Sequence, residues 1–174
     1  RAGGGARRLF VSAMTLTDHR DGDAASYPDI AQAISRFGAT GSVKADLAQL
    51  FRRLLFNVVS GNRDDHLRNH GFLRAREGWR LAPAFDMNPA RAAHPHSLSL
   101  DGATGGDQSV VTALSTHRLY ALSEGDAFAI LSDVVEAVSG WEREAKTVDL
   151  SLPERRIVEF GLTALPEARE LVRA

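Results

Sequence analysis

The clearest helical pattern of the chain ends near Ser60 and Gly61. Its apolar positions recur at steps of three and four residues, at Leu47, Leu50, Phe51, Leu54, Leu55 and Val58. Such spacing predicts an amphipathic helix with one buried stripe. The positions that fall on its other faces are Ala48, Gln49, Arg52 and Arg53. The sequence therefore predicts a packed helix immediately before a charged, aperiodic segment.

Further helices are predicted on either side of this one. Pro28 suits the first turn of a helix that reaches Phe37 and ends at Gly38. The C-terminal part of the chain is helical again, with helices over Val110 to Leu122, from Asp126 to Trp141, from Pro153 onward and, in a short piece, after Pro166. The apolar stretch from Phe10 to Leu16 is too short to assign as helix or strand.

One β-hairpin is predicted among the helices. Phe72-Leu73 and the stretch from Trp79 to Leu81 flank Glu77-Gly78, which is a turn signal. The second arm continues to Asp86. We therefore expect a mainly α fold, a helical bundle with one small β-hairpin that leads to Asp86.

Composition narrows the classes of function. A length of 174 residues fits one domain, which we expect to span 1–174. With 21 basic and 22 acidic residues, there is no electrostatic case for nucleic acid or an anionic membrane as the main partner. The absence of cysteine excludes disulfides and thiolate metal sites. No apolar run is long enough to span a bilayer and no signal peptide opens the chain, so we expect a cytoplasmic protein.

The charged segment after the packed helix carries candidate chemistry. Asp64 and Asn69 have the spacing Asp-x-x-x-x-Asn, and Asp86 follows the predicted hairpin. In protein kinases, an Asp takes the proton of the acceptor hydroxyl, an Asn five residues later binds magnesium, and a second Asp holds the metal that bridges the phosphates. This order of residues, after a packed helix, predicts phosphoryl transfer.

The stretch from Leu50 to Pro89 closely resembles the catalytic segment of HipA-like serine/threonine kinases, which are toxins of bacterial toxin–antitoxin modules. That family reads roughly Asn-x-Asp-x-His-x-Lys/Arg-Asn, then a hairpin, then Pro-x-Tyr/Phe-Asp. Here residues 62–69 read NRDDHLRN and residues 83–86 read PAFD. The flanking elements are also similar, so the resemblance covers essentially the whole chain and implies the C-terminal lobe of a kinase fold.

The resemblance implies a role for each matching residue. Asp64 would be the catalytic base, and Asn69 and Asp86 would bind Mg²⁺ and, through it, ATP. His66 stands where many kinases place a Lys that contacts the transferred phosphate, and Arg68 would add positive charge beside it. The family's glycine-rich loop and ATP-binding Lys lie upstream and are absent from this chain. We therefore expect this chain alone to be inactive.

The resemblance also implies partners. The intact protein would transfer the γ-phosphoryl group of ATP to a Ser or Thr hydroxyl of a protein, and family resemblance suggests an aminoacyl-tRNA synthetase. A HipB-like helix-turn-helix antitoxin would be the regulatory partner. No residue of this chain by itself identifies either partner.

Alternative interpretations stay open at the level of sequence. Residues 63–68 could form only a solvated charged loop, and His66 could be structural. Asn57 is expected to brace the loop by hydrogen bonding. A rival class is a metal-dependent hydrolase that uses Asp and His ligands, with the candidate histidines His66, His70, His94 and His96. A third interpretation is a non-catalytic binding module with a truncated kinase fold.

Overall fold

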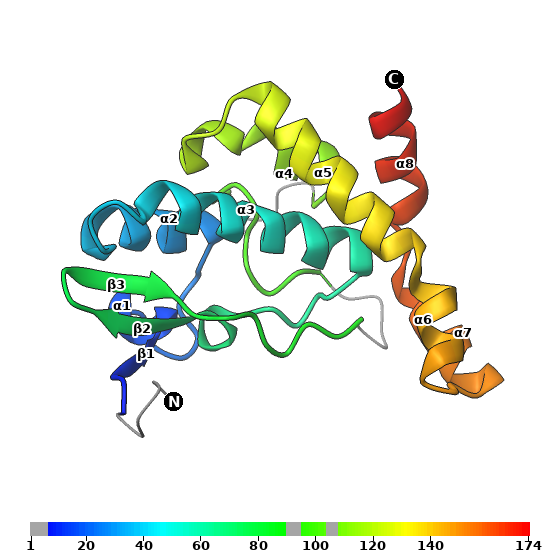
Figure 1. Cartoon of the computed structure of the whole chain (residues 1–174), viewed down its shortest axis with the longest axis horizontal. Helices are drawn as coiled ribbons and strands as arrows, with labels where there is room; N and C mark the ends of the chain where they lie inside the picture. The colour runs from blue at the N-terminus through cyan, green and yellow to red at the C-terminus, as the bar shows by residue number, and fades with distance from the viewer. Residues whose placement is uncertain (1–6, 90–94, 104–107) are drawn as a thin grey trace.

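Helix α3 (Val43–Ser60) forms the centre of the fold in the computed structural model, which describes residues 7–89, 95–103 and 108–174. Figure 1 shows α3 between a small sheet on one side and α5 (Glu124–Ser139) on the other. Helix α2 (Tyr27–Phe37) packs against its N-terminal half, and a capping box of Ser26 and Asp29 begins α2. The predicted positions of α2 and α3 are confirmed.

The predicted apolar stripe of α3 is the core of the protein. Leu50, Phe51, Leu54 and Leu55 are 0% exposed, and Leu47 and Val58 are nearly as well buried. The prediction was wrong for Arg53, which is only 4% exposed. Its guanidinium donates a hydrogen bond to the carbonyl oxygen of Ala82, beyond the hairpin. A long side chain can reach a partner across the core, and the spacing of apolar positions in the sequence gives no sign of this.

The sheet has three antiparallel strands in the order β1-β2-β3, rather than the two of the predicted hairpin. Strands β2 (Gly71–Ala75) and β3 (Gly78–Leu81) form the hairpin, with Ala75 paired to Gly78 across a two-residue turn. The stretch from Phe10 to Leu16 divides at Ser12. Its first half is β1 (Phe10–Ser12), which pairs with β2, and its second half is α1 (Ala13–Leu16).

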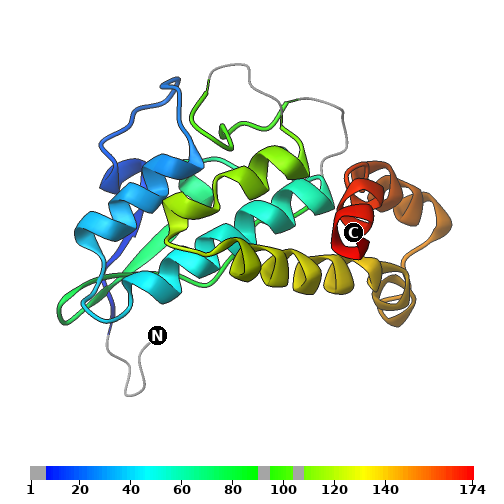
Figure 2. The same ribbon diagram turned by 90° about the horizontal axis from the view of Figure 1, so that it is seen from above.

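The predicted C-terminal helices are present, but the first of them is divided. The single helix expected over Val110 to Leu122 breaks into α4 (Val110–Ser115) and the 3₁₀ helix η2 (His117–Tyr120), because the hydroxyl of Thr116 bonds back to Ala113 and Ala121 is left-handed. Helix α5 ends at Ser139, and the remaining elements are α6 (Trp141–Thr147), α7 (Leu152–Gly161) and α8 (Leu165–Arg173). Figure 2 shows α6 to α8 gathered at one end of the molecule.

Replacing Leu54 or Leu55 with Ala is expected to lower the free energy of unfolding by about 2–5 kcal/mol, since both side chains are fully buried and their loss leaves a cavity. Gln49→Ala on the exposed face of the same helix is the control and should change it by less than about 0.5 kcal/mol. Urea unfolding followed by circular dichroism measures both. Equal effects of the two kinds of substitution would contradict the assigned faces of α3.

Candidate active site

The loop that carries Asp64 and Asn69 begins where α3 ends, at Gly61. Gly61 has a φ of 72°, and a Cβ atom there would lie 1.9 Å from the carbonyl oxygen of Gly161. Only glycine combines a left-handed backbone with so close an approach. The next residue, Asn62, donates its backbone N–H to the carbonyl of Asn57 at 2.9 Å. The start of the loop is therefore fixed against both α3 and the end of α7.

The two adjacent aspartates of the loop differ sharply in environment. Asp64 is exposed, whereas Asp65 is only 4% exposed. Tyr27 of α2 donates its hydroxyl hydrogen to the carboxylate of Asp65, and Nε2 of His70 lies 2.8 Å from the same oxygen. Asp65 therefore anchors the loop in the core, while Asp64 remains accessible from outside.

The pKa values of Asp65 and Tyr27 follow from the contacts of these two buried side chains. Burial by itself would raise the pKa of Asp65, but the hydrogen bond and charge of His70, with hydrogen bonds from Tyr27 and Asn57, outweigh it, so the pKa lies below its usual value. Burial, and then the charge of Asp65, raise the pKa of Tyr27 well above its usual value. Tyr27 thus stays protonated as a donor and Asp65 stays ionised as its acceptor.

A chain of amide side chains joins this anchor to Asp86. Asn57 donates its Nδ2 hydrogen to the Tyr27 hydroxyl at 2.8 Å. Asn62 donates its own Nδ2 hydrogens to Oδ1 of Asn57 at 3.1 Å and to the backbone carbonyl of Asp86 at 3.3 Å. The expectation that Asn57 braces the loop is confirmed, and the brace acts through Asn62. The same bridge ties the loop to the segment after the hairpin.

Asp86 itself has an unusual backbone. Its φ of 57° lies in the left-handed region, which few non-glycine residues adopt and which is often found at functional sites. Its side chain is exposed and accepts a hydrogen bond from Nδ2 of Asn88 at 3.3 Å. The accessible carboxylate of Asp86 therefore lies on the segment after the hairpin, which Asn62 holds against the loop.

Asn69 closes the loop on itself. It is the last residue of the 3₁₀ helix η1 (Leu67–Asn69), is buried, and donates its Nδ2 hydrogen to the backbone carbonyl of Asp64 at 3.4 Å. Within the described part of the chain, its Oδ1 accepts no hydrogen bond. The spacing of Asp64 and Asn69 therefore corresponds to a real contact, and it leaves one amide oxygen available.

The remaining two predicted site residues, Arg68 and His66, form no hydrogen bond or ion pair with Asp86 in the described part of the chain. Arg68 is exposed and forms an ion pair with Asp21, which belongs to the loop between α1 and α2. His66 is half-buried, and its Nδ1 has no hydrogen-bond partner among the described residues. Both line a cavity of about 180 Å³, together with Met14, Arg20, Asp21 and Ser97.

The structure brings Asp64 and Asn69 into contact and connects their loop to Asp86, but it directs Arg68 toward another loop.

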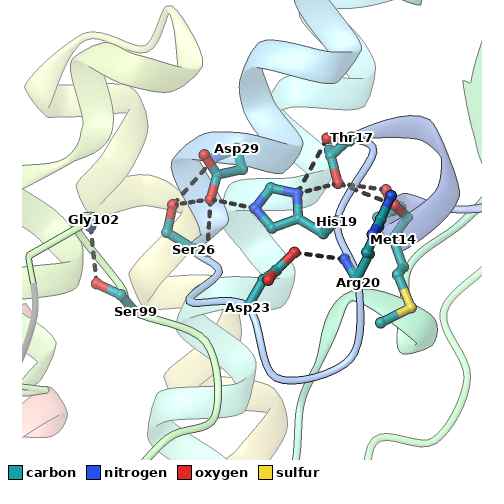
Figure 3. Close-up of polar contacts among 10 residues, drawn as sticks. Met14, Thr17, His19, Arg20, Asp23, Ser26, Asp29, Ser99 and Gly102 are labelled. Atoms are coloured by element: carbon teal, nitrogen blue, oxygen red, sulfur yellow. Dashed lines mark hydrogen bonds and ion pairs between the residues drawn. The ribbon is translucent and has the colours of Figure 1, made fainter.

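The loop that holds Asp21 is itself fixed by short polar contacts (Figure 3). Nδ1 of His19 lies 2.8 Å from the hydroxyl of Thr17, and Asp23 accepts the backbone N–H of Arg20 at 2.7 Å. The carboxylate of Asp29 accepts the hydroxyl of Ser26 at 2.7 Å and so closes the N-terminal end of α2. These contacts make the partner of Arg68 part of an ordered loop.

The rival metal-hydrolase site finds no support in the described part of the chain. Among those residues, no group of three or more His, Cys, Asp or Glu side chains could hold a metal ion. Nε2 of His70 lies 2.8 Å from the carboxylate of Asp65 and is therefore already engaged in a hydrogen bond. His94, a further candidate of that site, lies outside the described residues.

Comparisons with known proteins place the chain in a family. No curated protein sequence matches it significantly. A chain of the solved complex of HipA, HipB and operator DNA from the Shewanella oneidensis MR-1 toxin–antitoxin system shares its fold, with 17% identity and a TM-score of 0.64. The match covers 98% of this chain and 46% of that one, so this chain spans about half of its length. The HipA-like C-terminal domain model matches residues 1–141, and the chain therefore belongs to this family.

Proposed function

We propose that this chain is the catalytic C-terminal lobe of a serine/threonine protein kinase that transfers the γ-phosphoryl group of ATP to a protein hydroxyl. One observation carries the proposal. Asn62 hydrogen-bonds both to the anchored end of α3 and to the backbone of Asp86, and so holds the loop of Asp64 and Asn69 beside the Asp86 segment. Kinases need these three groups around one transferring phosphoryl group.

Each residue has a role that fits its environment. Asp64 is exposed, so a substrate hydroxyl can reach its carboxylate and give up its proton there. Asn69 and Asp86 offer an amide oxygen and an exposed carboxylate, and Mg²⁺ prefers oxygen ligands of this kind. Mg²⁺, when bound with ATP, neutralises charge on the phosphates. The left-handed backbone of Asp86 would fix the direction from which its carboxylate is offered.

Arg68 and His66 are proposed to contact the transferred phosphate. In the present arrangement, Arg68 pairs with Asp21, so it would have to release this carboxylate before it could face a phosphate. His66 lies two residues from Asp64, and its buried Nδ1 has no hydrogen-bond partner among the described residues, so its ring would have to turn outward before this nitrogen could bond to a phosphate oxygen. Release of Arg68 from Asp21 is therefore part of the proposed activation of the site.

The proposed partners follow the family. ATP would be clamped mainly by a glycine-rich loop and a Lys from a further lobe, because kinases place these groups there. The related solved structure contains HipB, which supports a HipB-like antitoxin as the regulatory partner. A protein, such as an aminoacyl-tRNA synthetase, would be the substrate, and the whole would act in the cytoplasm. Within the described residues, no helix is both long enough and apolar enough to cross a bilayer.

Phosphoryl transfer can be measured directly in a longer protein in which a HipA-like ATP-binding lobe is joined upstream of this chain. With Mg²⁺ and γ-labelled ATP, we expect label on Ser or Thr of the protein itself or of an added substrate. The 174-residue chain alone should bind Mg-ATP too weakly to detect by isothermal titration at micromolar concentration, because the positioning groups of the other lobe are missing.

The same preparation separates the rival function. A hydrolase would retain zinc, manganese or iron on purification and would release product without ATP. Metal content determined by mass spectrometry, together with an absence of label transfer in the longer protein, would overturn the kinase assignment.

A further inference from the structure

An apolar cavity lies between the C-terminal helices and the segment that follows Asp86. Its volume is about 320 Å³, at the lower end of the range of roughly 300–1,000 Å³ that small-molecule pockets occupy. Apolar side chains from four elements and from the Asp86 segment line it, among them Phe56, Met87, Val138, Trp141, Val158 and Leu162. Figure 1 shows these elements meeting where the C-terminal end of α3 approaches α6 and α7. We call it the helix-end cavity.

One buried polar group of the helix-end cavity lacks a partner. Ser60, the last residue of α3, is only 4% exposed, and its Oγ has no hydrogen bond among the described residues. A buried hydroxyl without a partner is unfavourable and rare in native structures. A bound molecule that hydrogen-bonds to Ser60 would relieve this.

Charge restricts the ligand further. Glu144 is the only charged residue among those that line the cavity; it is exposed and pairs with Arg143 at 3.1 Å. An anionic ligand would meet its carboxylate, and a cation would find no buried counter-charge beside Ser60. A neutral molecule fits the lining best.

We propose that the helix-end cavity binds a neutral, mostly apolar small molecule that carries one hydrogen-bonding group, and that this group bonds to Ser60. This site is separate from the proposed phosphoryl-transfer residues and does not depend on nucleotide. The cavity is connected to Asp86 through the backbone, because Met87 and Pro89 form part of the cavity wall and Met87 directly follows Asp86. Gly161 reinforces this wall, since a Cβ there would lie 2.8 Å from Cβ of Pro89. Binding would therefore change how firmly the Asp86 segment is supported.

The chain offers a direct test because it contains only two methionines. Met87 lines the helix-end cavity, whereas Met14 lies at the cavity beside Arg68. The protein is labelled with ¹³C at the methionine methyl groups and titrated with N-phenyl-1-naphthylamine, a neutral aromatic amine with one N–H donor. We expect a saturable shift of the Met87 resonance, no shift of Met14, and fluorescence of the probe that rises with the same dissociation constant.

Matched variants locate the binding. Ala137 is exposed on α5 and lines the cavity, so Ala137→Phe should occupy its mouth and weaken binding at least about tenfold. Ala129→Phe, also exposed on α5, does not line the cavity and should leave binding unchanged. Ser60→Ala removes the proposed hydrogen bond and should weaken binding roughly two- to tenfold. Thermal unfolding of each variant checks that the fold persists.

Three outcomes would overturn the proposal. The first is a shift of both methionines together, or no saturation, which indicates nonspecific adsorption of the probe. The second is equal binding by the Ala137 and Ala129 variants, or no effect of Ser60→Ala. The third is binding to this chain but not to the longer protein that carries the upstream half, which would mean that another segment of the protein fills the cavity.

Discussion

Replacing Asp64 with Asn is expected to lower phosphoryl transfer by about 10²–10⁴-fold in the longer protein that joins a HipA-like ATP-binding lobe to this chain, which is the range that a general base contributes. Asp64 is exposed and no side chain in the described residues depends on its carboxylate, so the fold should persist. Its backbone carbonyl, which accepts from Asn69, is unchanged by the substitution. The rate is measured with γ-labelled ATP at saturating Mg²⁺.

Asp86→Asn should reduce the rate in the same assay, and excess Mg²⁺ should recover part of it because the substitution weakens a metal ligand. The double variant should lose less than the product of the two single losses, since both groups act on one transition state. Glu77→Gln in the hairpin turn is the charge-matched control and should retain full activity. Near-normal activity of either aspartate variant would contradict the assigned roles.

Local sequence patterns predicted much of the secondary structure. The step of three and four residues identified the stripe that includes Leu54, because burial of one helical face repeats with the helical period. The two-residue turn and flanking apolar pairs identified the β2–β3 hairpin. The lack of periodicity after Ser60 predicted a loop, and in the structure Asn69 closes this loop by a hydrogen bond to the backbone of Asp64. Each of these features is encoded within a short stretch of chain.

Features that depend on distant residues could not be found in this way. Strand β1 forms only because β2, some sixty residues later, offers it an edge. The burial of Arg53 depends on Ala82, and the burial of Asp65 depends on Tyr27. The sequence shows two adjacent aspartates and gives no local sign of which one faces the core. His70, five residues after Asp65, was a possible sign that Asp65 is the buried aspartate. In the sequence alone, however, an Asp and a His at this spacing could equally be metal ligands.

Asp65→Ala is expected to lower the free energy of unfolding by about 3–6 kcal/mol, because two buried groups lose an ionised hydrogen-bond acceptor and each such bond is worth roughly 1.5–3 kcal/mol. The substitution leaves the hydroxyl of Tyr27 and Nε2 of His70 without their shared acceptor inside the core. Asp64→Ala, one residue earlier and exposed, should change stability by less than about 0.5 kcal/mol. Urea unfolding at pH 7 compares the two variants. Equal losses would contradict the buried anchor.

The pH dependence of the same variant tests the charge of Asp65. The folded protein holds the pKa of Asp65 below its unfolded value of about 3.9, so its stabilisation is present above that value and is lost as pH falls through the folded pKa. The stability difference between the parent protein and Asp65→Ala should therefore narrow as the pH falls below about 4. Subtracting the two curves removes carboxylates that titrate equally in both proteins, such as Asp126 and Glu154. A difference that stays constant down to pH 2 would show that Asp65 stabilises the loop as a neutral acid.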